Sequence, residues 1–245
     1  ATLKPKILWQ KAWLLKKQNQ DNEAIKAFEE LSRLDASSPN YRALFWQARS
    51  LKKINSTQDA EALFELIAQK DNLGFYGLLA HRELKKPLRK IAIKPIKEFA
   101  SPFATDEEKL YFSWLIAVKE YTVAARFLDQ VASELRSALA TNSDAETDRW
   151  YRLLLLYARV GSYQGLFNKL SELPAEARAK LLEDDPTLLF PQPFQSDVQK
   201  ASQEFSVPSE LVYAIMRQES SFNPEARSGA DAFGLMQVIP EVAKK

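Results

Sequence analysis

The sequence has no cysteine and a single histidine, His81, among its 245 residues. The lack of cysteine excludes disulfides, thiolate metal sites and cysteine nucleophiles. One histidine cannot form a histidine-based metal cluster, and no Gly-x-Ser-x-Gly turn supplies a serine to pair with it. His81 lies in a stretch that favours a helix surface. Acid–base chemistry must therefore rest on carboxylates, lysine or tyrosine, and we expect no metal and no cofactor.

The sequence also lacks an excess of one charge and any long apolar run. Its 34 basic and 32 acidic residues leave a net charge of +2, which gives no reason to expect nucleic-acid binding. The longest apolar runs, near residues 111–118 and 153–158, are far too short for a membrane span. No apolar signal core follows Ala1, which is not a natural start residue. We therefore expect a processed or truncated chain whose leader is absent.

Glycine is scarce, with six in the chain and four of them from Gly161 onward. No stretch of useful length alternates apolar and polar residues as a strand would. Apolar residues instead recur at spacings of three and four, which is typical of amphipathic helices and predicts an all-α protein. The pattern is seen at Ile25, Phe28, Leu31 and Leu34, at Leu63, Leu66 and Ile67, and at Leu110, Trp114 and Val118.

An internal repeat occurs with an offset of 36 residues. Each unit has the pattern of a helix, a turn with asparagine and a second helix. Small alanines let two helices approach, and a following phenylalanine fills the space between them, as in tetratricopeptide-like hairpins of an α-solenoid. Residues 153–173 have the same character, with a turn at Gly161. The matching pairs are Ala12 with Ala48, Leu15 with Leu51, Lys16 with Lys52, Lys17 with Lys53, Asn19 with Asn55, Ala24 with Ala60, Phe28 with Phe64, and Glu29 with Glu65.

Capping residues and prolines indicate where helices begin. Helix starts are predicted after Ser38-Pro39, after Thr105 and after Leu173-Pro174. Pro191 and Pro193 are separated by one residue, so they cannot continue a helix and favour extended chain. We therefore predict a superhelical scaffold domain over residues 1–190 and a different module over residues 191–245.

That module begins with predicted helices near residues 195–205 and 210–219. Leu211, Ile215 and Glu219 are spaced by four and share one helix face, which we expect to be buried. Apolar surroundings and the negative end of the helix dipole would both raise the pKa of Glu219, as a general acid requires. On the register alone, an ordinary surface acid is the favoured interpretation of Glu219.

The residues around Glu219 carry a more specific signal. The chain reads Arg217-Gln218-Glu219-Ser220-Ser221-Phe222-Asn223-Pro224, then Ser228, then Gly234-Leu235-Met236-Gln237-Val238-Ile239-Pro240. This resembles the catalytic domain of soluble, Slt-type lytic murein transglycosylases, which has a goose-lysozyme-like fold. Both motifs occur with the family's spacing, and the strict match covers about residues 211–240. More loosely, the helical part resembles the superhelical arm of the same enzymes, for example near residues 74–84.

The resemblance implies a role for four residues. Glu219 matches the single catalytic acid/base, Ser228 and Gln237 match polar groups near the sugar at the cleavage site, and Met236 matches a residue at the glycan groove. The expected fold is thus an α-superhelical solenoid followed by a partial lysozyme-like helical domain. In one departure, Asp231 stands where the family commonly has glycine. In another, Ile239 replaces a common methionine.

The resemblance further implies a periplasmic enzyme that cleaves peptidoglycan glycan strands and leaves 1,6-anhydromuramic ends. The helical arm could also bind cell-wall proteins. A tyrosine-bearing motif of the family, typically A-Y-N-A-G, is absent before Lys245. We therefore expect a truncated, inactive fragment with exposed apolar surface around Leu211, Ile215 and Met236.

Two other interpretations stay open from the sequence. The chain could be a non-enzymatic α-solenoid that binds peptidoglycan or proteins, with residues 195–245 as a vestigial tail. It could also be a hydrolase on the same fold, which would need a second carboxylate. The nearby candidates for that group are Glu225 and Asp231, and we expect both to be solvated.

Overall fold

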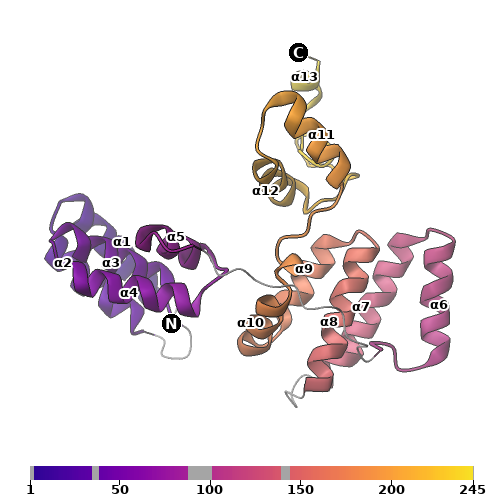
Figure 1. Ribbon diagram of the computed structural model, residues 1–245, viewed down its shortest axis with the longest axis horizontal. Helices are drawn as coiled ribbons and strands as arrows, with labels where there is room; N and C mark the ends of the chain where they lie inside the picture. The colour runs from indigo at the N-terminus through magenta and orange to yellow at the C-terminus, as the bar shows by residue number, and fades with distance from the viewer. Residues whose placement is uncertain (1–2, 35–38, 88–100, 139–143, 245) are drawn as a thin grey trace. The chain divides into compact units, whose positions relative to one another are not determined.

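The computed structural model describes residues 3–34, 39–87, 101–138 and 144–244. The chain forms two compact units, Ala1–Lys90 and Ile91–Lys245 (Figure 1). Within the described residues, regular structure is helical apart from isolated bridges that join Phe233 to Arg227 and to Val238. The predicted all-α class is therefore confirmed. The predicted junction between residues 190 and 191 lies inside the second unit and stays a prediction.

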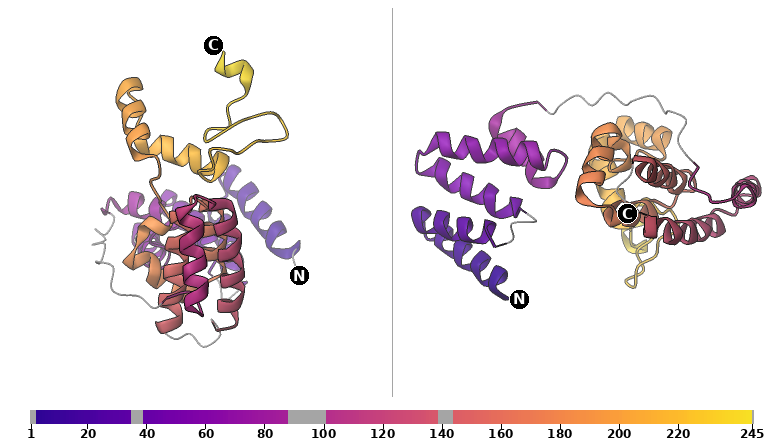
Figure 2. Two further views of the ribbon diagram at one scale, coloured as in Figure 1. Left: turned by 90° about the vertical axis from the view of Figure 1, so that its right-hand side faces the viewer. Right: turned by 90° about the horizontal axis from the view of Figure 1, so that it is seen from below.

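The first unit is a row of five helices. They are α1 (Leu3–Lys17), α2 (Asp21–Ser32), α3 (Tyr41–Lys53), α4 (Thr57–Lys70) and α5 (Phe75–Leu84). Each helix packs against the next along the chain, as the right-hand view of Figure 2 also shows. Ser38, from one predicted helix start, lies outside the described residues. The helix that follows begins at Tyr41, and the Asn40 side chain accepts a bond from the Ala43 amide as its N-cap.

The predicted 36-residue repeat is matched by equivalent burial in this unit. Phe28 and Phe64 are both enclosed, each in its own apolar cluster, and the alanine pairs of the repeat are buried as well. Large side chains at these positions would push the helices apart. The repeated alanines thus permit close helix approach, and the repeated phenylalanines fill the space that remains.

The hairpin turns share one backbone conformation. Asn19 and Asn55 have φ values of 59° and 66°, in the left-handed region, as do Lys119 at 64° and Gly161 at 72° in the second unit. In each turn the residue after the left-handed position bonds back to a carbonyl five residues earlier, for example Gln20 to Leu15. Asparagine and glycine tolerate this conformation, so the sequence signalled those turns. Lysine has no such preference, and the turn at Lys119 was not predicted.

The first unit contains a charge cluster that makes its stability depend on pH. The carboxylate of Glu83 accepts bonds from Arg49 and from Lys52, the latter at 2.9 Å. Burial on its own raises the pKa of Glu83, but these two bonds outweigh it, so the pKa lies below its ordinary value. A depressed pKa contributes stability that is present above the unfolded-state pKa and is lost as pH falls through the folded-state value.

We expect Glu83→Gln to lower the free energy of unfolding of the first unit by about 1 kcal/mol at neutral pH, because both cations are half-exposed and screened. The difference from wild type should shrink as pH falls and disappear once the Glu83 carboxyl is protonated in both the folded and the unfolded state. Urea unfolding at several pH values measures it. Glu65→Gln is the matched control, since the Glu65–Lys86 pair is exposed. Equal losses in the two variants would contradict the assignment.

The second unit opens with a run of neighbouring helices, which Figure 1 shows side by side from α6 to α9. Helix α6 starts after Thr105, as predicted, and the structure adds a reciprocal capping box between the Thr105 side chain and Glu108; Pro174 precedes α10. Trp150, Leu128 and Tyr157 lie in one large apolar core. The helices are α6 (Asp106–Ala117), α7 (Tyr121–Ala138), α8 (Asp144–Arg159), α9 (Tyr163–Glu172), α10 (Ala175–Asp184) and the 3₁₀ helix η2 (Pro186–Leu188). We call α6 through η2 the α6–η2 scaffold.

The chain then continues as α11 (Gln195–Phe205), α12 (Ser209–Ser220) and the short α13 (Pro240–Ala243). The bounds of α11 are those predicted, and α12 begins directly after Pro208. A loop of about twenty residues separates α12 from α13 and contains both bridges. None of the helices in the described part of the chain combines the length and apolar character needed to cross a bilayer.

Candidate active site

Glu219 lies in the last turn of α12 and is exposed. The helix face that it shares with Leu211 and Ile215 was predicted to be buried, and this prediction is wrong: Leu211 is 51% exposed and Ile215 is half-buried. Met236 is 37% exposed. Exposed apolar surface was also expected around Leu211, Ile215 and Met236, and this is confirmed at Leu211 and Met236 but not at Ile215. Glu219 therefore stands at the edge of an open apolar surface.

The opposite face of α12 is the one that packs. Met216 is buried together with Val198 of α11 and Phe222, which follows the helix. The rings of Tyr163 and Phe167, both from α9, close this small cluster. The register of α12 is thus set by contact with α9 and α11, and this contact leaves the Glu219 side open.

A hydrogen bond joins the two sequence motifs beside Glu219. The hydroxyl of Ser220 donates to the carbonyl of Leu235 at 2.9 Å and lies 3.0 Å from the carbonyl of Met216. Leu235 directly precedes Met236 and Gln237. The bond therefore brings the residues after Glu219 against the Gly-Leu-Met-Gln stretch, although fifteen positions separate Ser220 and Leu235 in the sequence.

Ser228 and Gln237 shape the loop between α12 and α13. The Ser228 hydroxyl accepts bonds from the amides of Ala230 and Ala232, at 3.2 and 3.1 Å. The Gln237 side-chain amide donates to the carbonyls of Ala226 and Gly234, each at 3.0 Å. The oxygen of Ser228, as acceptor, and the side-chain nitrogen of Gln237, as donor, are thus used to hold the loop. The hydroxyl hydrogen of Ser228 and the side-chain oxygen of Gln237 would be the atoms that contact a sugar.

Asp231 occupies a left-handed backbone position, with φ of 55°. Glycine adopts this conformation without strain, which gives a physical reason for glycine at this place in the family, and aspartate tolerates it better than most residues. The Asp231 carboxylate pairs with Arg227 at 2.6 Å, and both side chains are about two-thirds exposed. Glu225 is also exposed. The two carboxylates considered as second catalytic groups are thus solvated.

We expect Asp231→Gly to leave stability nearly unchanged and Asp231→Ala to cost about 1 kcal/mol, since alanine has neither glycine's freedom nor aspartate's local bonding. Both variants lose the exposed ion pair, which contributes little. The measurement is hydrogen exchange of the loop amides, which should be faster in the Asp231→Ala variant than in the Asp231→Gly variant. Equal protection in alanine and glycine variants would show that the backbone conformation carries no strain.

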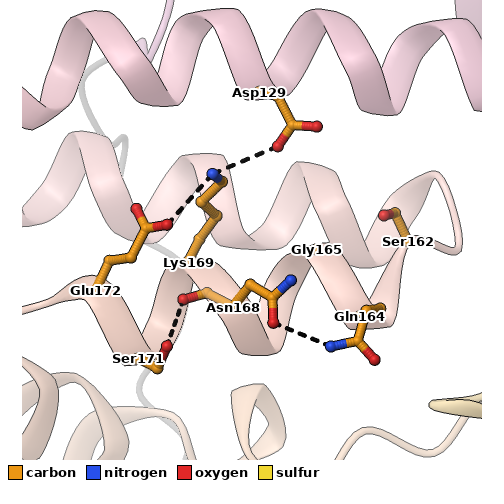
Figure 3. Close-up of a pocket in the computed structure, with 8 residues that line it drawn as sticks. All are labelled: Asp129, Ser162, Gln164, Gly165, Asn168, Lys169, Ser171 and Glu172. Carbon is orange, nitrogen blue, oxygen red and sulfur yellow. Dashed lines mark hydrogen bonds and ion pairs between the residues drawn. The ribbon is translucent and has the colours of Figure 1, made fainter.

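A polar hollow lies next to this region, between α7 and α9 (Figure 3). Lys169 reaches towards Asp129 and Glu172, each at 3.4 Å, and Gln164 bonds to Asn168 at 3.0 Å. The Gln164 side chain also accepts a bond from the hydroxyl of Ser221, at 2.8 Å. The part of the chain that the structure describes holds no group of three or more His, Cys, Asp or Glu side chains suited to a metal ion.

Comparison with known proteins identifies the C-terminal part of the chain. Residues 196–245 match the family described as "Transglycosylase SLT domain". This part of the chain thus carries the sequence pattern of a transglycosylase SLT domain. We call residues 196–245 the SLT segment. It contains Glu219 and the other three residues singled out from the sequence.

Curated relatives resemble a short stretch of the chain. A "membrane-bound lytic murein transglycosylase C" from Serratia proteamaculans is 56% identical over 48 residues, which are 20% of this chain and 13% of the relative. The protein of the same name from Sodalis glossinidius is 59% identical over 46 residues, or 19% of this chain and 13% of the relative. The chain thus spans a small fraction of the curated relatives that it matches.

Solved structures resemble nearly the whole chain. An inactive glutamate-to-glutamine mutant of the lytic transglycosylase Slt from Pseudomonas aeruginosa matches with a TM-score of 0.67 and 23% identity, over 98% of this chain and 36% of that one. The 70-kDa soluble lytic transglycosylase from Escherichia coli matches with a TM-score of 0.58 and 19% identity, over 90% and 33%. At these identities the likeness concerns the fold, and it confirms the predicted fold class of helical hairpins followed by a partial lysozyme-like domain.

Proposed function

We propose that the protein containing this chain is a lytic transglycosylase that cleaves the bond between N-acetylmuramic acid and N-acetylglucosamine in peptidoglycan. The observation that carries the proposal is the placement of Glu219. It ends a helix of the SLT segment, it is open on one side, and the Ser220–Leu235 bond draws the second family motif against it. The names of the curated relatives support the same substrate.

In the proposed mechanism, Glu219 is the only catalytic carboxylate. Its proton passes to the glycosidic oxygen as the bond to C1 of N-acetylmuramic acid breaks, and the acetamido group of that sugar stabilises the developing positive charge. The ionised carboxylate then removes the proton of the same sugar's 6-hydroxyl, whose oxygen bonds to C1. This closes a 1,6-anhydro ring, releases the second sugar and returns the proton to Glu219, so no water is consumed.

The solvated positions of Glu225 and Asp231 favour this mechanism over hydrolysis. A hydrolase of the usual kind needs a second carboxylate facing the scissile bond. Asp231 is paired with Arg227 in the loop, and Glu225 is exposed. In the proposed enzyme the sugar's own acetamido and hydroxyl groups replace that carboxylate. Ser228 and Gln237 would contact the sugar, and Met236 would line the glycan groove.

The proposed substrate places the protein in the bacterial cell envelope, and we assign it to the periplasm. Peptidoglycan strands are the proposed partner of the SLT segment. Binding of cell-wall proteins by the helical part stays a prediction.

The function is tested by digesting purified peptidoglycan with the 245-residue chain and with the full-length gene product. Mass spectrometry separates the outcomes, because an anhydromuramic end is one water lighter than a reducing end. Anhydromuropeptides would support the proposal. Reducing ends would favour a hydrolase. Binding to peptidoglycan without any released product, even from the full-length protein, would favour the non-enzymatic solenoid.

A further inference from the structure

Arg217, two residues before Glu219, is held by the α6–η2 scaffold and the turn that follows it. Its guanidinium donates to the backbone carbonyl of Leu189. The guanidinium carbon lies 4.5 Å from the centre of the Phe167 ring and 5.7 Å from that of Phe190. Burial lowers the pKa of Arg217 from its ordinary value, but an arginine stays charged. A cation is thus held by a carbonyl and two aromatic rings.

The residues directly after Glu219 are held by the same helix of the scaffold. The Ser221 hydroxyl donates to Gln164 of α9 at 2.8 Å. Phe222 is only 2% exposed, and its ring centre lies 5.3 Å from that of Tyr163 and 6.4 Å from that of Phe167. Phe167 therefore contacts the chain both before and after Glu219.

The backbone after Glu219 shows why these contacts are needed. Ser221 and Phe222 have φ values of 49° and 65°, so two successive residues without glycine's freedom are left-handed. Such conformations persist where surrounding contacts fix them, and they cluster at functional sites. Here the fixing contacts come from Gln164, Tyr163 and Phe167, all on α9.

Helix geometry links the Arg217 contacts to the direction of Glu219. Successive residues of an α-helix are about 100° apart around the axis, so Arg217 and Glu219 point in nearly opposite directions, about 160° apart. Contact of Arg217 with α9 and Leu189 therefore turns Glu219 towards the open side of α12. A rotation of the helix about its axis would move the Glu219 carboxylate away from a bound sugar.

We propose that Arg217 is a positioning residue, which fixes the rotation of α12 on the scaffold and so aims Glu219 at the glycosidic oxygen. This rests on the proposed function of Glu219. Helix α9 then helps to orient the catalytic residue, in addition to supporting the SLT segment. Phe167 is the scaffold residue through which the coupling acts.

The first arm of the test measures positioning without activity. In the 245-residue chain, Arg217→Ala should raise the hydrogen exchange of the amides of residues 216–222 at least about tenfold, with the amides of α8 unchanged. Phe167→Leu should also raise this exchange, and the double variant should show less than the sum of the two effects, because the two changes share the Arg217–Phe167 contact although each also breaks contacts of its own. Additive effects of the two variants would overturn the proposed coupling through Phe167.

The second arm measures peptidoglycan cleavage by the full-length protein. Arg217→Ala should lower kcat by about 10- to 100-fold and change KM by less than about twofold, as expected when a catalytic group is misplaced but substrate contacts remain. Arg217→Lys should restore part of the loss, because it keeps the charge and a donor but not the planar group over Phe167. Failure of lysine to restore any activity, with the fold intact, would contradict a role through the charge and the Leu189 bond.

Two controls separate positioning from simple destabilisation. Val198→Ala weakens the same small core without touching Arg217, and rates are compared after correction for the folded fraction. Arg178→Ala removes another arginine that bonds a carbonyl, that of Ser171, away from the site.

If the Arg217→Ala loss equals the Val198→Ala loss, the role is structural and the proposal is wrong. If Glu219→Gln is fully active, the proposed function fails and the positioning role fails with it. If Glu219→Gln is inactive and Arg217→Ala is normal, the positioning role alone fails.

Discussion

Glu219→Gln in the full-length protein is expected to lower the release of anhydromuropeptides by roughly 10³-fold, in the range usual for loss of a general acid and base. Glutamine keeps the size and most of the polarity of glutamate but has no proton to donate to the glycosidic oxygen. Since Glu219 is exposed, the substitution should leave the unfolding transition where it is. The rate is measured by mass spectrometry of the soluble products over time.

The loop carboxylates supply the controls for this experiment. Glu225→Gln and Asp231→Asn make the same chemical change at the solvated acids near Glu219, and each should reduce the rate less than about threefold, since neither acid has a part in the proposed mechanism. A loss at Asp231 comparable to that at Glu219 would mean that two carboxylates act. The mechanism would then be that of a hydrolase, and the product ends should be reducing.

The sequence predicted the elements better than their contacts. The bounds of α11, the helix start at Thr105 and the buried alanines of the repeat all follow from local rules, since caps, prolines and helical spacing act within a few residues. The choice of packed face does not follow from such rules. In α12 two faces are apolar, and contact with α9 buries the one with Met216.

The same limit explains the stripe of Leu110 and Trp114 in α6 and of Val118, the residue that caps its C-terminus. Its spacing is that of an apolar helix face, but these side chains are exposed, and Phe112 and Leu115 lie in the core instead. Helical periodicity identifies a helix and an apolar side, but it cannot say which neighbour is present to cover that side.

The residues of the candidate site also differ in whether the sequence could predict their roles. Glu219, Ser228, Met236 and Gln237 could be named from two motifs, because the motif residues are the ones that the family shares. Arg217 sits within the first motif, but its role depends on Phe167 and Leu189, which lie 50 and 28 positions away in the sequence. Nothing local to the motif indicates these partners. The burial expected around Glu219 failed for a related reason, since it assumed a neighbour for the face of Leu211.

Phe222→Ala is expected to have the largest effect on stability. Phe222 is the largest buried side chain of a small cluster, whose other buried members are Val198 and Met216. Truncating a buried phenylalanine usually costs about 3–5 kcal/mol, and a cluster this small has little else to hold α11 and α12 against α9. The amides of α11 and α12 should therefore lose their protection from hydrogen exchange, and the cores of α6 to α9 should keep theirs.

Tryptophan fluorescence gives an independent view of the same experiment. All five tryptophans lie at or before Trp150, outside the SLT segment, so the fluorescence-detected urea transition should hardly move in Phe222→Ala. Phe205→Ala is the matched control, since it makes the same change in α11 at a side chain that is 68% exposed, and it should alter stability by less than about 0.5 kcal/mol. If Phe222→Ala shifted the fluorescence transition as strongly as it reduced protection in α11 and α12, the SLT segment and the α6–η2 scaffold would unfold as one cooperative body. In that case the whole second unit would hold Glu219 in place, and substitutions in the core around Trp150 should also change the position of Glu219.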